Sequence, residues 1–75
     1  MRLYLLTNQH YRNWDCYFGK VIAAIDEAQA RRLANFSTGD EGSIWEDADK
    51  VTCSEIAAES IYNHACTVLD DFHAG

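Results

Sequence analysis

The chain has 75 residues and a formal net charge of −6, with 48% hydrophobic and 12% aromatic residues and no proline. This composition excludes an intrinsically disordered chain, and the length indicates a single domain, residues 1–75, with a thin core. Residues 1–32 hold five bases and three acids, whereas residues 33–75 hold one base and nine acids. Such an acidic half favours a basic protein partner and disfavours direct binding to nucleic acid.

The cysteines and the N-terminus indicate the compartment. Cys16, Cys53 and Cys66 cannot all pair with one another, and an odd, widely spaced set is typical of reduced thiols. The apolar run at residues 3–6 is ended by Asn8, which makes it too short for a signal peptide or a membrane span. We therefore expect a cytoplasmic protein with no membrane partner.

The first half of the chain predicts a hairpin followed by a helix. Residues 3–7 are apolar on both faces, which predicts a strand inside a sheet, and residues 16–25 predict a second, antiparallel strand with Tyr17 and Lys20 on opposite faces. Asp26 is a good helix N-cap with Gln29 three residues later. In the helix that follows, Arg31 and its neighbours on one side are expected to face water.

The second half predicts a long acidic loop and two further strands. Residues 37–49 form the loop, residues 51–56 predict a third strand with a bulge near residues 54–55, and residues 66–72 predict a fourth. The element order is then ββαββ. This order predicts an α+β fold in which one helix packs on one face of a four-stranded, mainly antiparallel sheet.

Several segments resemble small phage- and prophage-encoded acidic proteins of ββαββ type. The resemblance lies in residues 14–17 (WDCY), 21–24 (VIAA), 27–33 (EAQARRL) and 72–75 (FHAG), together with Trp45 and the strand that holds Val51, Cys53 and Ile56. Some small acidic proteins from such elements are anti-CRISPR proteins. The resemblance therefore implies an inhibitor that acts in the host cytoplasm, with a type I CRISPR surveillance complex as the most concrete target.

Catalytic and metal-binding patterns are weak. His64 and Cys66 are the closest pair of zinc-ligand residues, whereas a structural zinc site usually uses two close pairs. Cys53 and Cys66 lie at apolar strand positions in acidic surroundings, which disfavour a thiolate nucleophile. The carboxylates do not match a calcium loop. We expect no catalytic residue, no metal site and no cofactor, so the chain is predicted not to be an enzyme.

The acidic loop is the predicted partner-binding site. The residues expected to contact a basic nucleic-acid-binding protein, such as a CRISPR effector subunit, are Asp40, Glu41, Trp45, Glu46, Asp47 and Asp49. Trp45 has two interpretations, an exposed aromatic anchor or a buried lid under the loop. Trp14 is a second contact candidate, or else part of a satellite core around Tyr17. The alternative function is a phage structural, assembly or adaptor protein that acts by oligomerisation, and both a monomer and a homodimer remain open.

Overall fold

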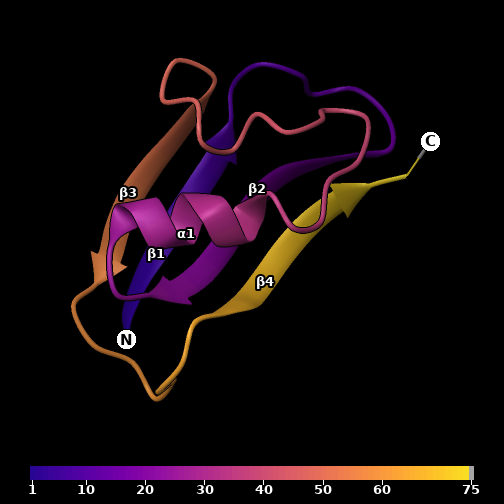
Figure 1. The fold of residues 1–75 in the computed structure, drawn as a ribbon. Coiled ribbons are helices and arrows are strands. Elements are labelled where there is room, and N and C mark those ends of the chain that lie inside the picture. The colour runs from indigo at the N-terminus through magenta and orange to yellow at the C-terminus, as the bar shows by residue number, and fades with distance from the viewer. Residues whose placement is uncertain (75) are drawn as a thin grey trace.

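The computed structural model describes residues 1–74 and contains the predicted elements. These are β1 (Arg2–Asn8), β2 (Cys16–Ala24), α1 (Glu27–Ala34), β3 (Val51–Ala57) and β4 (Cys66–His73). Within the described residues the strands form a four-stranded antiparallel sheet in the order β3-β1-β2-β4 (Figure 1). The predicted ββαββ fold is confirmed, and β1 lies inside the sheet as its two apolar faces predicted.

Helix α1 begins where the sequence predicted. Asp26 has an extended backbone, and its carboxylate accepts a hydrogen bond of 2.8 Å from the backbone N–H of Gln29. The Gln29 side chain in turn accepts a 2.8 Å hydrogen bond from the backbone N–H of Ile25. These bonds satisfy donors that a helix start would otherwise leave unpaired. Because a helix of eight residues is marginal alone, its stability depends on the buried Ala30 and Ala34 packing against the sheet.

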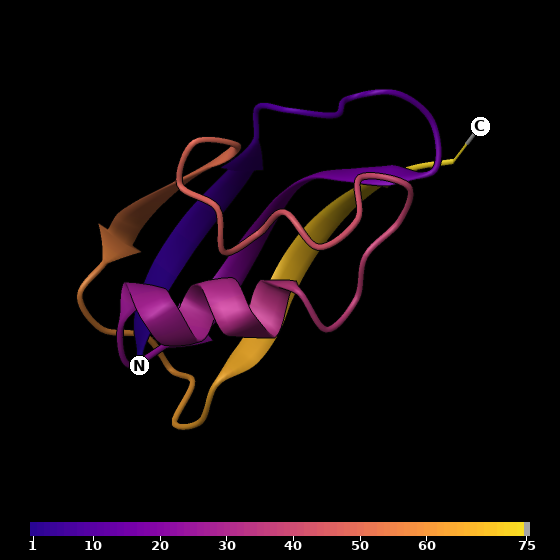
Figure 2. The same ribbon diagram turned by 45° about the horizontal axis from the view of Figure 1, so that its top comes forward.

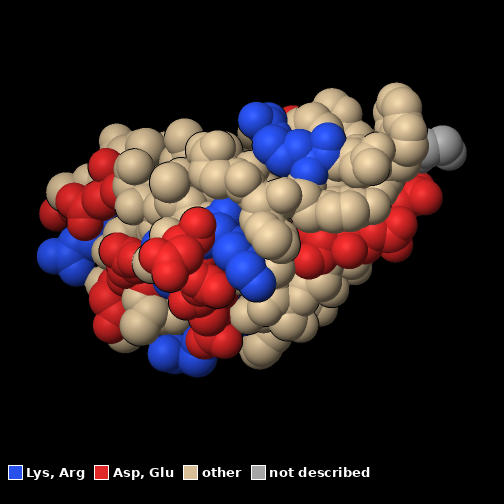
Figure 3. All heavy atoms as spheres, turned by 90° about the horizontal axis from the view of Figure 1, so that it is seen from above, with Lys and Arg blue, Asp and Glu red and all other residues tan. Residues whose placement is uncertain are grey.

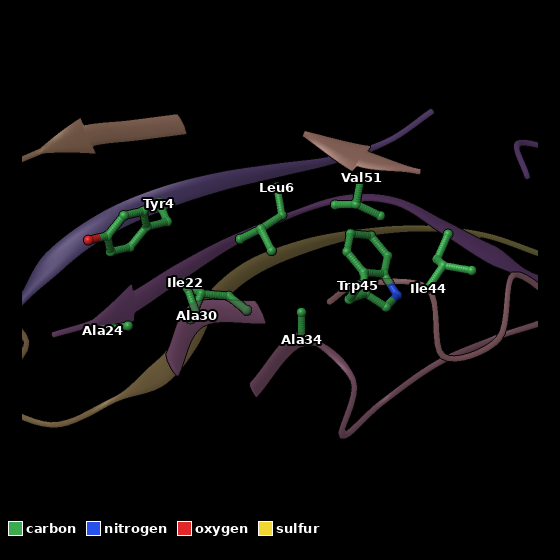
Figure 4. Packing of buried hydrophobic residues seen from close by; sticks show 9 residues of the cluster. All are labelled: Tyr4, Leu6, Ile22, Ala24, Ala30, Ala34, Ile44, Trp45 and Val51. Atoms are coloured by element: carbon green, nitrogen blue, oxygen red, sulfur yellow. The ribbon is translucent and has the colours of Figure 1, made fainter. Parts of the chain in front are cut away.

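The fold has two layers. Helix α1 and the segment 37–50 lie on the same side of the sheet, and Figure 2 shows both in front of the strands. The core fills the space between these layers (Figure 4). Its buried hydrophobic residues are Tyr4, Leu6, Ile22, Ala24, Ala30, Ala34, Ile44, Trp45 and Val51. Residues of the central strands alternate between this core and the opposite face, as the period of two in a β-strand requires.

Three irregularities change the register of the sheet, and two of them bear on the predictions. The pairing of β2 with β4 shifts between Tyr17 and Gly19, and this bulge brings Tyr17 to the same side as Lys20. The Lys20 ammonium lies 4.2 Å from the centre of the Tyr17 ring, so the prediction that these residues occupy opposite faces was wrong. The predicted bulge in the third strand is present one residue later, because Leu3 pairs with Ala57 and Tyr4 with Glu55.

The segment 37–50 is held close to the start of β2. The backbone N–H of Asp40 donates a 2.6 Å hydrogen bond to the carbonyl of Asp15. Gly39 lies so near that a Cβ atom there would overlap this same carbonyl oxygen. The carbonyl of Asp15 belongs to the backbone, and the backbone of residue 39 fixes the position of its Cβ atom. Neither atom can therefore move aside by a rotamer change. The close approach explains why a residue without a side chain stands at position 39.

Replacement of Gly39 by alanine is expected to lower the free energy of unfolding by about 1–3 kcal/mol, the usual cost of overpacking. The displaced carbonyl would also weaken its hydrogen bond with Asp40. Urea denaturation monitored by circular dichroism measures the change. Ser43→Ala, at an exposed position in the same loop, serves as the control and should stay within about 0.5 kcal/mol of the unaltered protein. An equal stability of the two variants would contradict the tight contact.

Candidate functional site

Two of the six residues predicted to bind a partner are buried. Trp45 is 0% exposed, and its indole N–H donates a 3.0 Å hydrogen bond to Oε2 of Glu41. Oε1 of Glu41 accepts hydrogen bonds from the backbone N–H groups of Tyr17, at 3.1 Å, and Gly39, at 3.0 Å. The prediction of partner contact was therefore wrong for both residues. The alternative interpretation of Trp45, a lid under the loop, is confirmed, and Figure 4 shows it between Val51 and Ala34.

Lys20 completes a buried polar network around Trp45. Its ammonium lies 5.0 Å from the centre of the Trp45 ring and donates hydrogen bonds to the carbonyls of Ala34, at 2.8 Å, and Ser37. These carbonyls lie at and just beyond the C-terminus of α1, where a cation is favoured by the helix dipole. Burial lowers the pKa of Lys20, while the nearby carboxylate of Glu41 opposes that shift. The network is structural, because it joins the loop, the helix and the sheet.

Arg31 is also buried, contrary to the prediction that it faces water. Its Nη1 donates to the carbonyls of Trp45, at 3.1 Å, and Val51, at 3.0 Å, and its Nε pairs with Glu27 at 2.8 Å. The guanidinium has five donors in a fixed fork, which allows it to join the helix to both ends of the turn before β3.

Burial of these cations makes the surface more acidic than the sequence suggests. Within residues 1–74, four of the six bases and eleven of the twelve acids are at least partly exposed. The surface therefore carries one more negative charge than the formal net charge of −6. Figure 3 shows the acidic side chains in separate groups, with basic side chains between them. Acidic side chains therefore outnumber basic ones at the surface, and they are unevenly distributed.

The remaining predicted site residues form one compact group and one outlier. Glu46, Asp47 and Asp49, here called the acidic turn, are exposed in the turns that precede β3. The backbone N–H of Asp49 donates a 2.9 Å hydrogen bond to Oδ1 of Asp47, and Lys50 pairs with Asp47 at 3.9 Å. That pair is about 40% exposed on both sides, so water screens most of its interaction. Asp40 is exposed elsewhere in the loop.

Sequence analysis did not identify the second face of the sheet as a candidate surface. Leu5 is 39% exposed and Leu69 is 66% exposed on the face opposite to α1. A hollow of about 180 Å³ opens there, below the roughly 300–1,000 Å³ of common ligand pockets. Its lining residues are Leu5, Gly19, Lys20, Val21, Leu69, Asp70 and Asp71. The apolar character of both faces of residues 3–7 indicated that both faces could be covered, but it does not tell which face the chain itself covers and which is left for a partner.

Trp14 lies outside the core. It is 63% exposed in the loop between β1 and β2, whereas Tyr17 packs against the main core, so the predicted satellite core is wrong. Arg12, from the same loop, stacks over the ring of Phe18 at 4.7 Å, and His73 stacks on that ring with centroids 3.7 Å apart. This loop is therefore a further exposed surface with aromatic and basic character.

The residues with reactive or ligating side chains are dispersed. Within residues 1–74, no group of three or more His, Cys, Asp and Glu residues could hold a metal ion. Cys16 is a buried free thiol, and Cys53 and Cys66 are partly buried free thiols. Burial, followed by the negative charge of Glu27, raises the pKa of Cys53.

Comparison of the chain with protein-family models, with curated proteins and with solved structures found no match. The resemblance to small phage-encoded proteins therefore stays a prediction. In the part of the chain that the structure describes, no helix combines the length and the apolar character needed to cross a membrane.

Proposed function

We propose that the protein is a non-enzymatic inhibitor that binds the basic, nucleic-acid-handling surface of a partner and competes there with nucleic acid. The observation that carries this proposal is the acidity of the surface, where eleven acids and four bases of residues 1–74 are at least partly exposed. Proteins that bind duplex DNA line their grooves with Lys and Arg to meet about one negative charge per 1.7 Å. A folded acidic surface is complementary to such a groove.

The acidic turn is the contact that we assign to this partner, together with Asp40. These residues are the exposed members of the predicted site, and the turn is fixed by hydrogen bonds from Asp47 and Lys50 backbone N–H groups to the carbonyls of Ile44 and Asp47. A fixed turn presents its carboxylates without a large ordering cost on binding. Trp45 and Glu41 support the turn from below and do not touch the partner.

A competition experiment tests the proposal. A purified type I CRISPR surveillance complex, the target that the resemblance suggests, is loaded with a fluorescent DNA duplex, and the protein is added at several salt concentrations. We expect displacement of the DNA, with an effect that weakens steeply as salt shortens the Debye length from about 30 Å at 0.01 M to about 8 Å at 0.15 M.

The charge-reversed variant D47K/D49K should need at least about tenfold more protein for half displacement, because like charges across an interface are costly. Its unfolding transition should remain near that of the unaltered chain, since both side chains are exposed. If the DNA stays bound and the protein fails to bind the complex at low salt, the proposal is wrong.

A second candidate function, an adaptor or assembly protein that oligomerises, is favoured by the exposed apolar side chains on the uncovered sheet face. Such a protein would show a concentration-dependent mass in sedimentation equilibrium with little sensitivity to salt. A monomer over the micromolar range would exclude the homo-oligomeric form of this candidate.

A further inference from the structure

We propose that the uncovered face of the sheet is a second docking site for the basic partner, and that an arginine or lysine side chain of this partner fills the hollow beside Asp71. The proposal rests on the proposed function, because it assumes a basic protein partner. It adds to the acidic turn a contact on the side of the molecule opposite to α1. Four features support this assignment.

The first feature is a row of apolar side chains across three strands. Leu5 on β1 pairs directly with Val21 on β2, and Val21 pairs with Leu69 on β4. Their sequence neighbours Leu6 and Ile22 are fully buried under α1, so the row itself points to the other face. This row is apolar surface that the chain itself leaves uncovered and that a partner can bury.

The second feature is a missing side chain at the floor of the hollow. Gly19 lies two residues before Val21 and pairs with Thr7 on one side and Asp71 on the other. Since glycine has no Cβ, no side chain from this position enters the hollow of about 180 Å³ that it lines, and a Cβ there would lie 3.2 Å from the carbonyl oxygen of Leu6. This volume lies well below the roughly 300–1,000 Å³ of common ligand pockets, which favours a single side chain over a larger ligand.

The third feature is the charge at the rim. The Asp71 side chain is 65% exposed and pairs with Nε2 of His73 at 2.9 Å. Lys20 contributes to the lining of the hollow, but its ammonium donates to carbonyls on the α1 side and so does not cover this face. An apolar hollow with a carboxylate at one end complements a side chain with an aliphatic stem and a cationic head.

The fourth feature is that the negative charge of the protein disfavours two other occupants of this face, a nucleic acid and a second copy of the chain. A nucleic-acid strand would bring its phosphates toward Asp71 and is therefore disfavoured. A second copy of the chain would bring two strongly negative surfaces together, whereas a basic partner gains from the same charge. Charge complementarity therefore selects a basic protein.

The experiment uses the full chain labelled with ¹⁵N and two capped probe peptides, Gly-Leu-Arg-Leu-Gly and Gly-Leu-Glu-Leu-Gly, at millimolar concentration. We expect the arginine peptide, and not the glutamate peptide, to shift the amide signals of Gly19, Val21, Leu69 and Asp71. Asp71→Asn should weaken the binding about fivefold, as expected for an exposed ion pair. Leu69→Ala should weaken it about tenfold through lost apolar contact.

Ile61→Ala and Glu59→Gln are the matched controls, since both positions are exposed and neither lines the hollow. Both should leave the affinity for the arginine peptide unchanged. Shifts confined to the acidic turn, equal shifts with both peptides, or no shifts at all would each overturn the docking site. A dimer formed through this face in sedimentation would overturn it as well, by assigning the face to a second copy. The DNA-displacement assay tests the proposed function independently of these outcomes.

Discussion

Replacing Trp45 with alanine is expected to remove most of the free energy of unfolding of the protein at 25 °C. The side chain is fully buried at the centre of the core, and Trp→Ala or Phe→Ala changes in cores cost about 3–5 kcal/mol. Small domains have a total stability of only about 5–15 kcal/mol, and a chain of this length lies near the lower end. Far-UV circular dichroism and urea denaturation at 25 °C measure the loss.

The chain supplies a matched control for this substitution. Trp14 is 63% exposed, so Trp14→Ala makes the same chemical change outside the core and should shift the free energy of unfolding by less than about 0.5 kcal/mol. A cooperative transition of Trp45→Ala within about 1 kcal/mol of the unaltered protein would contradict the burial of this residue. It would also restore Trp45 as a candidate for partner contact.

Replacing Glu41 with glutamine is expected to lower the free energy of unfolding by about 2–4 kcal/mol, although the two side chains have nearly the same shape. The carboxylate accepts from the Trp45 indole on one oxygen and from the backbone N–H groups of Tyr17 and Gly39 on the other. In either orientation of the glutamine amide, an NH₂ group faces another donor. The charge that stabilises the buried ammonium of Lys20 is lost as well.

Urea denaturation again provides the measurement, with Glu46→Gln at an exposed site as the control. Trp45→Phe removes the indole donor, so the double variant E41Q/W45F should be less unstable than the sum of its single changes by about 1 kcal/mol. Strict additivity would show that the carboxylate and the indole do not interact. Equal stabilities of Glu41→Gln and Glu46→Gln would contradict the claim that the buried hydrogen-bond network of Glu41 stabilises the fold.

The sequence predicted the elements because their signals are local. The Asp26 cap, the two-sided apolar pattern of residues 3–7 and the short apolar runs near residues 51 and 66 each depend on a few neighbouring residues. The bulge in the third strand was predicted to within one residue, because its signal also lies in neighbouring residues. The bulge at Tyr17 was missed because it depends on how β4 pairs with β2.

The buried charges could not be predicted in the same way. Glu41 and Arg31 resemble ordinary surface residues in sequence, since charged side chains are seldom buried unless they are paired. They are buried because the loop packs on the sheet beside the helix and leaves backbone groups of Tyr17, Gly39, Trp45 and Val51 to be satisfied. Only the tertiary fold shows that these backbone groups need charged side chains as hydrogen-bond partners. The one local signal was the pair Ile44 and Trp45 within an acidic segment, which predicted the lid.

The central claim, that the acidic turn binds a basic partner, is tested most directly by the association rate. Stopped-flow measurements with the surveillance complex would compare the unaltered chain with D47N/D49N and with E55Q/E59Q, a control that removes the same charge. Residues 47 and 49 precede β3, whereas residues 55 and 59 lie at and beyond its far end (Figure 1). An asparagine amide oxygen at position 47 can still accept the turn's hydrogen bond from the backbone N–H of residue 49, so the fold is preserved.

At low salt we expect D47N/D49N to associate at least about fivefold more slowly, with a smaller loss near 0.15 M, because salt screens exposed charges. E55Q/E59Q should stay within about twofold of the unaltered chain, since both residues lie away from the acidic turn and the Arg2–Glu55 ion pair that is lost is exposed to water. Equal slowing by both variants would show that net charge alone attracts the partner. Unchanged rates in both variants would contradict the account of the acidic turn.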